Sequence, residues 1–334
     1  MGNFKVEVYY KVSNKLKYCL ITALINYLLL YSGCKEEEKY VMTGEDSLRI
    51  KLTAISDSLD KEFSKKPPAY KILYPKRGIS YSKLVNKYGQ NSANLILALN
   101  RIDRKNLRRR DSLVVPDTVV KNWKYYSPFP LKVEAAFQIP KLIVVSQKVQ
   151  AFAAYQLGNL ILWGPTSTGK EETPTPNGLF HTNWKAEETT STFDDEWKLR
   201  WNFNLDNFEG VALHQYETPG YPASHSCVRL YEKDAEWIYN WADQWIVTAD
   251  EESILAYGTP VIIFDEYDFD SPKPWLEMVS DPQSAKVSLS ELEDEVDDYF
   301  SLILERKKKR IELIARRDSV KIASQKKTNL RVKD

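Results

Sequence analysis

Histidine and cysteine are scarce in this chain, with three residues of each among 334. The formal net charge is only +1 although 28% of the residues are charged, so no global attraction toward nucleic acid is expected. The apolar stretch at residues 18–31 holds about 14 residues, fewer than the roughly 20 that a helix needs to span a bilayer. With 43% hydrophobic residues the chain can still bury a substantial core, and its length favours two or three modules.

In the first 33 residues, lysines lead into the apolar stretch, and the small residues Ser32 and Gly33 precede Cys34. This pattern resembles a bacterial lipoprotein signal peptide. In such signals the cysteine becomes the lipidated first residue of the mature protein. The resemblance implies export, with Cys34 anchored by lipid to a bacterial membrane that faces the periplasm or the cell surface. An uncleaved short anchor and a buried helix are the alternatives.

This interpretation leaves one free thiol in the mature chain. Cys19 would leave with the signal, and Cys34 would carry lipid as a thioether. Cys227 would then have no partner with which to form an internal disulfide. A single unpaired thiol in an exported protein is a candidate reactive group.

Residues 34–68 are predicted to form a linker and one helix. Leu48, Ile50, Leu52, Ile55 and Leu59 fall roughly on one helical face, and prolines at 67–68 end the pattern. A spacer that holds the following domains away from a membrane is the interpretation we favour.

Residues 69–118 are predicted to form a small α/β module. The pattern indicates a strand at 70–74, a helix capped by Ser80 and stopped by Gly89, a second helix ending near Asn100, and a strand at 112–116. Three motifs accompany this order of elements: Lys-Tyr-Gly at 87–89, Ile-Leu-Ala-Leu-Asn at 96–100 and Leu-Val-Val-Pro at 113–116. The order and the motifs together resemble a LysM domain. That family binds N-acetylglucosamine-containing glycans, so the resemblance implies glycan as a partner. A spacer of the same fold is the alternative.

A proline-containing connector at 119–139 leads into a mainly β region. Short strands are indicated at 142–145, 149–155, 159–163, 197–204, 211–214 and 259–264. Several short strands without intervening helices favour an all-β sandwich or barrel.

Residues 164–170 match the spacing of a phosphate-binding loop, but their context excludes that function. Glu171 stands where a hydroxyl should bind magnesium, and the Thr-Pro-Thr-Pro at 173–176 cannot form the required helix. We therefore expect no nucleotide. The segment instead reads as a loop built on proline and glycine that enters a strand.

Cys227 lies close in sequence to two of the three histidines, His214 and His225. A thiol near an imidazole is a nucleophile candidate, because the thiolate is the reactive form and a paired imidazole can generate it. A helix predicted at 232–245 should place Cys227 near a helix start, where amide dipoles stabilise a thiolate. A buried cysteine acting as a small hydrophobe is the alternative.

The order of these motifs resembles the L,D-transpeptidase catalytic domain. The resemblance covers about residues 140–268: the Thr-Pro-Thr loop, the strand ending at His214, the Ser-His-Ser-Cys-Val-Arg at 224–229, the helix and a Thr-Pro-Val strand at 259–261. It implies a β-sandwich of that family. A zinc site from His214, His225 and Cys227 is disfavoured, since no fourth ligand is evident. No metal or cofactor is expected.

The resemblance also implies roles for individual residues. Cys227 would be the nucleophile and His214 the general base, with its other ring nitrogen held by a backbone carbonyl. His225 would orient the site or act as the alternative base. The backbone N–H groups of Ser226 and Cys227 would form the oxyanion hole. Arg229 and Ser224 would bind substrate; for Arg229 a structural ion pair is the alternative.

The implied reaction is acyl transfer on peptidoglycan stem peptides. An amine acceptor would give a cross-link and water would give an L,D-carboxypeptidase, while a non-catalytic peptidoglycan-binding lipoprotein is the further alternative. Two features depart from the family. Ser226 stands where glycine is usual, which fits if the backbone there is not left-handed, and the interval from His214 to Ser224 is short.

A C-terminal helix and tail are predicted at 285–325. Ser288 and Glu291 form a potential capping box, and Leu292, Val296 and Ile303 belong to an apolar stripe. We favour packing onto the catalytic domain or a solvated tail over contact with an anionic membrane or nucleic acid.

Overall fold

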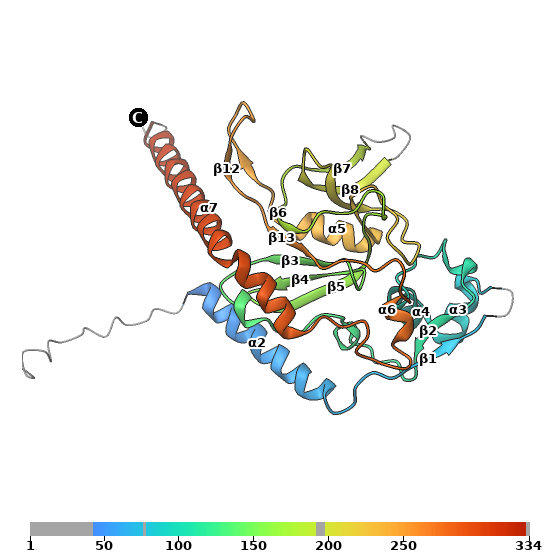
Figure 1. Ribbon diagram of the computed structural model, residues 1–334. Coiled ribbons are helices and arrows are strands. Elements are labelled where there is room, and N and C mark those ends of the chain that lie inside the picture. Colours follow the sequence, from blue (N-terminus) through green and yellow to red (C-terminus); the bar gives the residue numbers. More distant parts are fainter. Residues whose placement is uncertain (1–42, 76–77, 192–197, 332–334) are drawn as a thin grey trace, which may run out of the picture. The chain divides into compact units, whose positions relative to one another are not determined.

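The computed structural model describes residues 43–75, 78–191 and 198–331. The expected signal peptide and Cys34 lie outside these ranges. The chain divides into two units, Met1–Thr43 and Gly44–Asp334, and the second carries the elements described below (Figure 1). Within the described ranges, no helix combines the length and apolarity required to cross a membrane.

The largest element is one nine-stranded sheet in the order β6-β13-β3-β4-β5-β10-β9-β8-β7. Two neighbouring pairs are parallel, β13 with β3 and β10 with β9, and the rest are antiparallel. The predicted mainly β fold is confirmed. Because β5 pairs with β10, the strands form a single curled sheet rather than two separate sheets of a sandwich. The strands are β3 (Leu142–Ser146), β4 (Ala151–Gln156), β5 (Asn159–Ser167), β6 (Gly178–His181), β7 (Lys185–Thr190), β8 (Lys198–Asp206), β9 (Val211–Gln215), β10 (Val228–Leu230) and β13 (Pro260–Phe264).

Strand β3 shows how the middle of the sheet is buried on both faces. Its apolar run has no polar alternation, and successive side chains point to opposite faces. Leu142 and Val144 join one hydrophobic cluster, while Ile143 and Val145 join the other. The second cluster is completed by the helix α5 (Glu232–Trp241). A short hairpin of β11 (Ile246–Val247) and β12 (Ile254–Ala256) follows.

The strand–helix–helix–strand order expected for the small module is present. It consists of β1 (Tyr70–Leu73), α3 (Tyr81–Tyr88), α4 (Gln90–Leu99) and β2 (Leu113–Pro116), and β1 pairs antiparallel with β2. The Ser80 side chain caps α3 by accepting from the Lys83 N–H, as predicted. Asn100 ends α4, and its amide exchanges hydrogen bonds with the backbone N–H and carbonyl of Val114.

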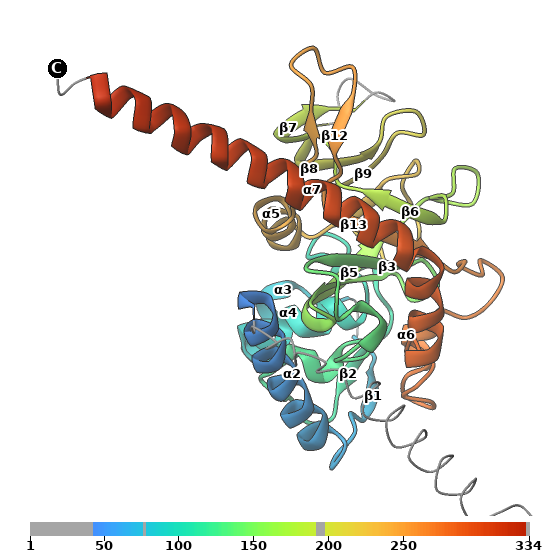
Figure 2. The same ribbon diagram turned by 90° about the vertical axis from the view of Figure 1, so that its left-hand side faces the viewer.

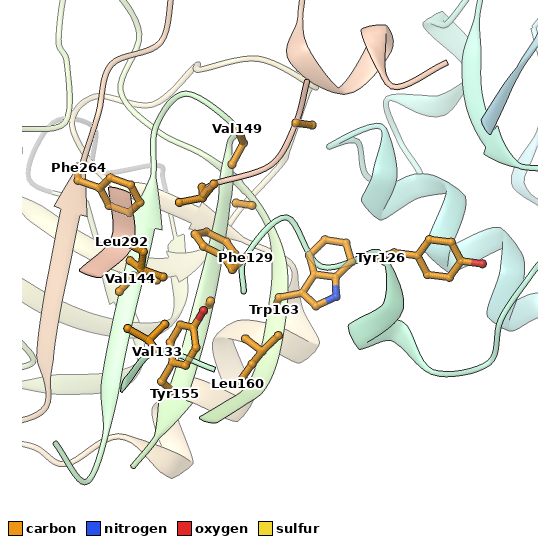
Figure 3. Close-up of a cluster of buried hydrophobic side chains, with 14 of the residues drawn as sticks. Tyr126, Phe129, Val133, Val144, Val149, Tyr155, Leu160, Trp163, Phe264 and Leu292 are labelled. Carbon is orange, nitrogen blue, oxygen red and sulfur yellow. The ribbon is translucent and has the colours of Figure 1, made fainter. Parts of the chain in front are cut away.

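The module and the sheet share one hydrophobic core. The first cluster combines Leu99 and Val114 of the module with Tyr155 and Trp163 of the sheet. The connector also contributes side chains to this cluster from two short 3-10 helices, η2 (Trp123–Tyr126) and η3 (Glu134–Ala136). Figure 3 shows Tyr126 lying beyond Trp163, toward the helices of the module. A hydrogen bond also joins the module to the sheet, because the buried guanidinium of Arg101 donates to the Val149 carbonyl at 2.8 Å.

Helix α2 (Gly44–Phe63) packs along this body. Its role as a spacer from a membrane stays a prediction. Phe63 meets the Tyr125 ring edge-on at 5.1 Å between centroids. Asp57 forms an ion pair with Lys132 at 2.9 Å. Figure 2 shows α2 on the side of the molecule that carries β5 and the module.

The predicted C-terminal helix is present as α7 (Leu289–Arg331), preceded by the short α6 (Pro274–Glu277). Its capping box is formed, since the Glu291 N–H donates to the Ser288 hydroxyl at 3.1 Å and the Ser288 N–H donates to the Glu291 carboxylate at 3.4 Å. Leu292, Val296 and Ile303 are buried in the first cluster. The favoured expectation of packing onto the catalytic domain is confirmed for this part of the helix (Figures 1 and 2).

Candidate active site

The parallel pairing of β9 with β10 brings the candidate residues together. Arg229 lies opposite His214 in this register, and Cys227 immediately precedes β10. Because side chains alternate along a strand, Cys227 and Arg229 share a face, and that face is the one to which His214 points. A small cavity of about 30 Å³ is lined by Ser191, Leu199, His214, Tyr216, Ser224, His225, Cys227 and Arg229.

The turn that carries Cys227 is held by the loop at 168–175. Two successive N–H groups, of Ala223 and Ser224, donate to the Thr168 carbonyl at 2.9 and 3.0 Å. The Lys170 N–H in turn donates to the Ser224 carbonyl at 3.0 Å. The segment whose spacing imitates a phosphate-binding loop therefore acts as the scaffold of the candidate catalytic turn.

Thr175 completes this scaffold with its hydroxyl. The hydroxyl accepts from the Gly169 N–H at 2.8 Å and donates to the Ser226 carbonyl at 2.8 Å. Gly169 is required sterically, because a Cβ there would overlap the Thr173 carbonyl oxygen and the Thr175 nitrogen. The sequence singled out this loop but gave no indication that Thr175 touches the catalytic turn, since the contact spans 51 residues.

Ser226 adopts a left-handed conformation, with φ of +74°. The condition under which a serine would fit without strain is therefore not met, and the position has the backbone for which glycine is suited. Its N–H donates to the Thr173 carbonyl at 3.2 Å. The expected oxyanion-hole role of Ser226 conflicts with this geometry, because its donor is already used within the scaffold. The N–H of Cys227 is the remaining donor of the expected pair.

The environment of Cys227 differs from the expected one. Strand β10 separates Cys227 from α5, which begins only at Glu232, so no helix dipole acts at the thiol. Burial raises the pKa of the Cys227 thiol to about 11, against smaller lowering effects of the Ala212 backbone and Arg229. The thiol donates to the Gly210 carbonyl at 3.2 Å. The predicted thiolate stabilisation is thus wrong, and the resting group is a neutral thiol.

His214 is held as a neutral imidazole. Its side chain is buried, and Nδ1 lies 3.0 Å from the Gln215 carbonyl oxygen, the kind of contact that was expected. Because that oxygen only accepts, Nδ1 carries the proton and Nε2 keeps its lone pair. The pKa of His214 is lowered to about 4, mainly by burial; the Gln215 contact acts in the opposite direction, and the Arg229 charge adds a smaller lowering effect. His214 can therefore accept a proton at neutral pH.

Arg229 supplies a cation at the mouth of this site. Its guanidinium stacks on the Tyr216 ring, 4.6 Å from the centroid. Among the described residues, no carboxylate forms an ion pair with Arg229, in contrast to the alternative considered for it. The charge is therefore available to an anionic group. The sequence did not predict a role for Tyr216, whose ring supports the Arg229 guanidinium.

Ser224 and His225 line the same cavity in different ways. The Ser224 hydroxyl donates to the Cys227 carbonyl, so its hydrogen fixes the turn instead of being offered to a ligand. The hydroxyl oxygen can still accept a hydrogen bond, so the substrate-binding role of Ser224 stays a prediction. His225 is partly exposed at the cavity wall, next in sequence to the left-handed turn.

Known proteins support the assignment of this region. Residues 140–263 match the family model of the L,D-transpeptidase catalytic domain. An L,D-transpeptidase from Mycobacterium smegmatis is 21% identical over 38% of this chain and 59% of its own, with a TM-score of 0.31. This chain therefore spans less than two thirds of that relative.

Two further solved structures are covered almost completely. The L,D-transpeptidase (Yku) from Stackebrandtia nassauensis is 16% identical over 60% of this chain and 98% of its own, with a TM-score of 0.35. The L,D-transpeptidase from Xylanimonas cellulosilytica is 21% identical over 57% and 98%, with a TM-score of 0.37. No curated protein matches the chain. The comparisons therefore show a match of residues 140–263 to the L,D-transpeptidase catalytic domain.

Proposed function

We propose that this protein is an L,D-transpeptidase that acts on peptidoglycan stem peptides through a Cys227 thioester. The observation that carries the proposal is the cavity shared by Cys227, His214 and Arg229 within a domain of this family. A thiol and a neutral imidazole with an available nitrogen can carry out acyl transfer to and from a peptide. The Arg229 guanidinium, which has no ion-pair partner among the described residues, can hold a substrate carboxylate.

The first half-reaction forms the acyl-enzyme. The Cys227 sulfur attacks the carbonyl carbon between a diamino acid and the terminal D-alanine, while His214 Nε2 takes the thiol proton. The Cys227 N–H stabilises the oxyanion of the tetrahedral intermediate. The His214 imidazolium then returns the proton to the alanine nitrogen, the C–N bond breaks, D-alanine leaves and a thioester remains. Proton transfer accompanies the attack because burial keeps both groups uncharged at rest.

The second half-reaction resolves the thioester. An acceptor amine attacks the thioester carbon and gives its proton to His214, which passes it to the departing Cys227 sulfur. The product is an amide, either a cross-link or an attached amine acceptor. Water in place of the amine gives a carboxylic acid, which is the L,D-carboxypeptidase alternative.

Muropeptide analysis of sacculi rich in tetrapeptide stems tests this proposal. Purified protein should release D-alanine and produce new cross-links, and Cys227→Ala should do neither. Tripeptide stems without new cross-links would favour the carboxypeptidase. Sacculus binding that survives Cys227→Ala, with no product from either protein, would favour the non-catalytic peptidoglycan-binding lipoprotein and contradict the enzyme proposal.

We further propose that the protein is lipid-anchored through Cys34 and exported, on the support of the apolar stretch and small residues that precede it. Mass analysis of the N-terminal peptide should find lipid on Cys34, and Cys34→Ala should abolish it. The boundaries 69–118 for a LysM-like module and 140–268 for the catalytic domain are part of the same proposal. Glycan binding by the module is supported by its element order and is tested by sacculus pull-down.

A further inference from the structure

A second and larger cavity adjoins the candidate active site. Its volume is about 620 Å³, a size typical of ligand-binding clefts. One wall belongs to the small module, with Arg104 and Lys105, and the opposite wall belongs to the catalytic domain, with Glu236 on α5. Tyr216 lines both this cleft and the small cavity of Cys227, so the two spaces adjoin at its ring.

The two walls of the cleft are fixed to each other. Asp103 and Thr218 are joined by two hydrogen bonds, from the Asp103 N–H to the Thr218 carbonyl at 3.0 Å and from the Thr218 N–H to the Asp103 carboxylate at 2.9 Å. Lys105 and Glu217 form an ion pair at 2.9 Å. The buried Tyr231 hydroxyl also donates to the Ile102 carbonyl. With the shared hydrophobic core, these contacts make the cleft a preformed feature.

The charges that face the cleft are of both signs. Arg104 is positioned by Tyr81, whose ring lies 4.0 Å from its guanidinium and whose hydroxyl accepts a hydrogen bond from it at 3.1 Å. In the described part of the chain, neither Arg104 nor the exposed Glu236 takes part in an ion pair. A cation and an anion thus face the same space from opposite walls. Lys233 and Trp123 line it as well, with the ammonium stacked on the indole at 4.1 Å.

We propose that this cleft binds a peptidoglycan stem peptide, with a carboxylate of the peptide at Arg104 and an ammonium group at Glu236. The proposal rests on the function proposed above, and it gives the module a direct part in substrate binding. A stem peptide with a diamino acid carries carboxylate and ammonium groups in one chain, which complements the two walls. A neutral glycan would leave both charges without a partner.

Binding of a stem tetrapeptide to the Cys227→Ala protein tests the cleft without any turnover. In that background, Arg104→Glu and Glu236→Lys should each weaken binding by about tenfold, the effect of losing one charge-assisted hydrogen bond. Arg108→Glu is the matched control. It makes the same change of charge on an exposed side chain outside the cleft, and it should bind as the parent does.

The outcomes separate the two proposals. The proposal that the cleft binds the peptide would be contradicted by any of three results. These are unchanged affinity in both cleft variants, an equal loss of affinity in Arg108→Glu, and no binding by the parent protein. Calorimetric melting of each variant shows whether a loss of binding reflects unfolding, and Arg104→Gln and Glu236→Gln then replace any variant that fails to fold. A protein with active Cys227 that binds tetrapeptide through Arg104 and Glu236 but never releases D-alanine would instead contradict the proposed enzymatic function.

Discussion

Arg229 lies directly opposite His214 in the parallel pairing of β10 with β9. The pKa of His214 is lowered to about 4, mainly by burial, and the Arg229 charge is a smaller cause of this lowering. Burial likewise raises the pKa of Cys227 to about 11. At neutral pH the two groups are therefore a thiol and an imidazole, not a thiolate–imidazolium pair.

Replacing Arg229 should change the acid side of the pH–rate profile. In the proposed mechanism His214 is the general base and can act only when neutral, so activity should be present above its pKa and be lost as the pH falls through about 4. Arg229→Gln removes a positive charge beside the imidazole, so the midpoint of this limb should move to higher pH. The measurement is the rate of Cys227 acylation by a carbapenem between about pH 3 and 7, which covers the expected acid side of the pH–rate profile. A midpoint that stays or moves down would contradict the pairing.

Alkylation of Cys227 should accelerate steeply with pH. Because the thiol has a pKa of about 11, its thiolate fraction rises roughly tenfold per pH unit throughout the range from neutral to about pH 10. Peptide-resolved mass spectrometry after timed iodoacetamide treatment separates Cys227 from Cys19 and Cys34. A rate that levels off near neutral pH would mean that an ion pair already exists in the resting site.

Gly169→Ala should disrupt the scaffold of the catalytic turn. The added Cβ would overlap the backbone at Thr173 and Thr175, so the free energy of unfolding should fall by about 2 kcal/mol and acylation should slow. Gly44→Ala is the control, because a Cβ at Gly44 meets no atom within 4 Å. Denaturant unfolding measures both variants. Equal stability of the two would show that the loop at 168–175 tolerates displacement.

Ser226→Gly should stabilise the protein by about 1 kcal/mol, because φ of +74° strains a serine and suits a glycine. Ser226→Ala keeps the strain and removes only the hydroxyl, so it should change stability by less than about 0.5 kcal/mol. Chemical denaturation of the three proteins distinguishes backbone strain from a side-chain contribution. A loss of stability in Ser226→Gly would indicate that the hydroxyl, not the backbone, matters.

Local patterns in the sequence were enough to predict much of the fold. The apolar runs at 142–145 and 260–264, the Ser80 cap and the Ser288–Glu291 capping box were all found where expected. The grouping of His214, Cys227 and Arg229 in one cavity also agrees with the motif spacing. These features depend on residues close together in the chain, so they can be predicted from a single sequence.

The errors arose where distant residues decide the outcome. Strand β10 was overlooked because its three residues owe their conformation to pairing with β9 and β5. The direction of the Cys227 pKa shift depends on burial, and the use of the Ser226 N–H depends on Thr173. The hydrogen bonds between Asp103 and Thr218 join segments 115 residues apart, and no local sequence pattern predicts them.

The central claim is that Cys227 forms an acyl-enzyme, and intact-protein mass spectrometry after incubation with imipenem tests it most directly. The account predicts a stoichiometric covalent adduct that maps to Cys227 and is absent from Cys227→Ala. No adduct on the intact protein, or an adduct that persists in Cys227→Ala, would contradict it.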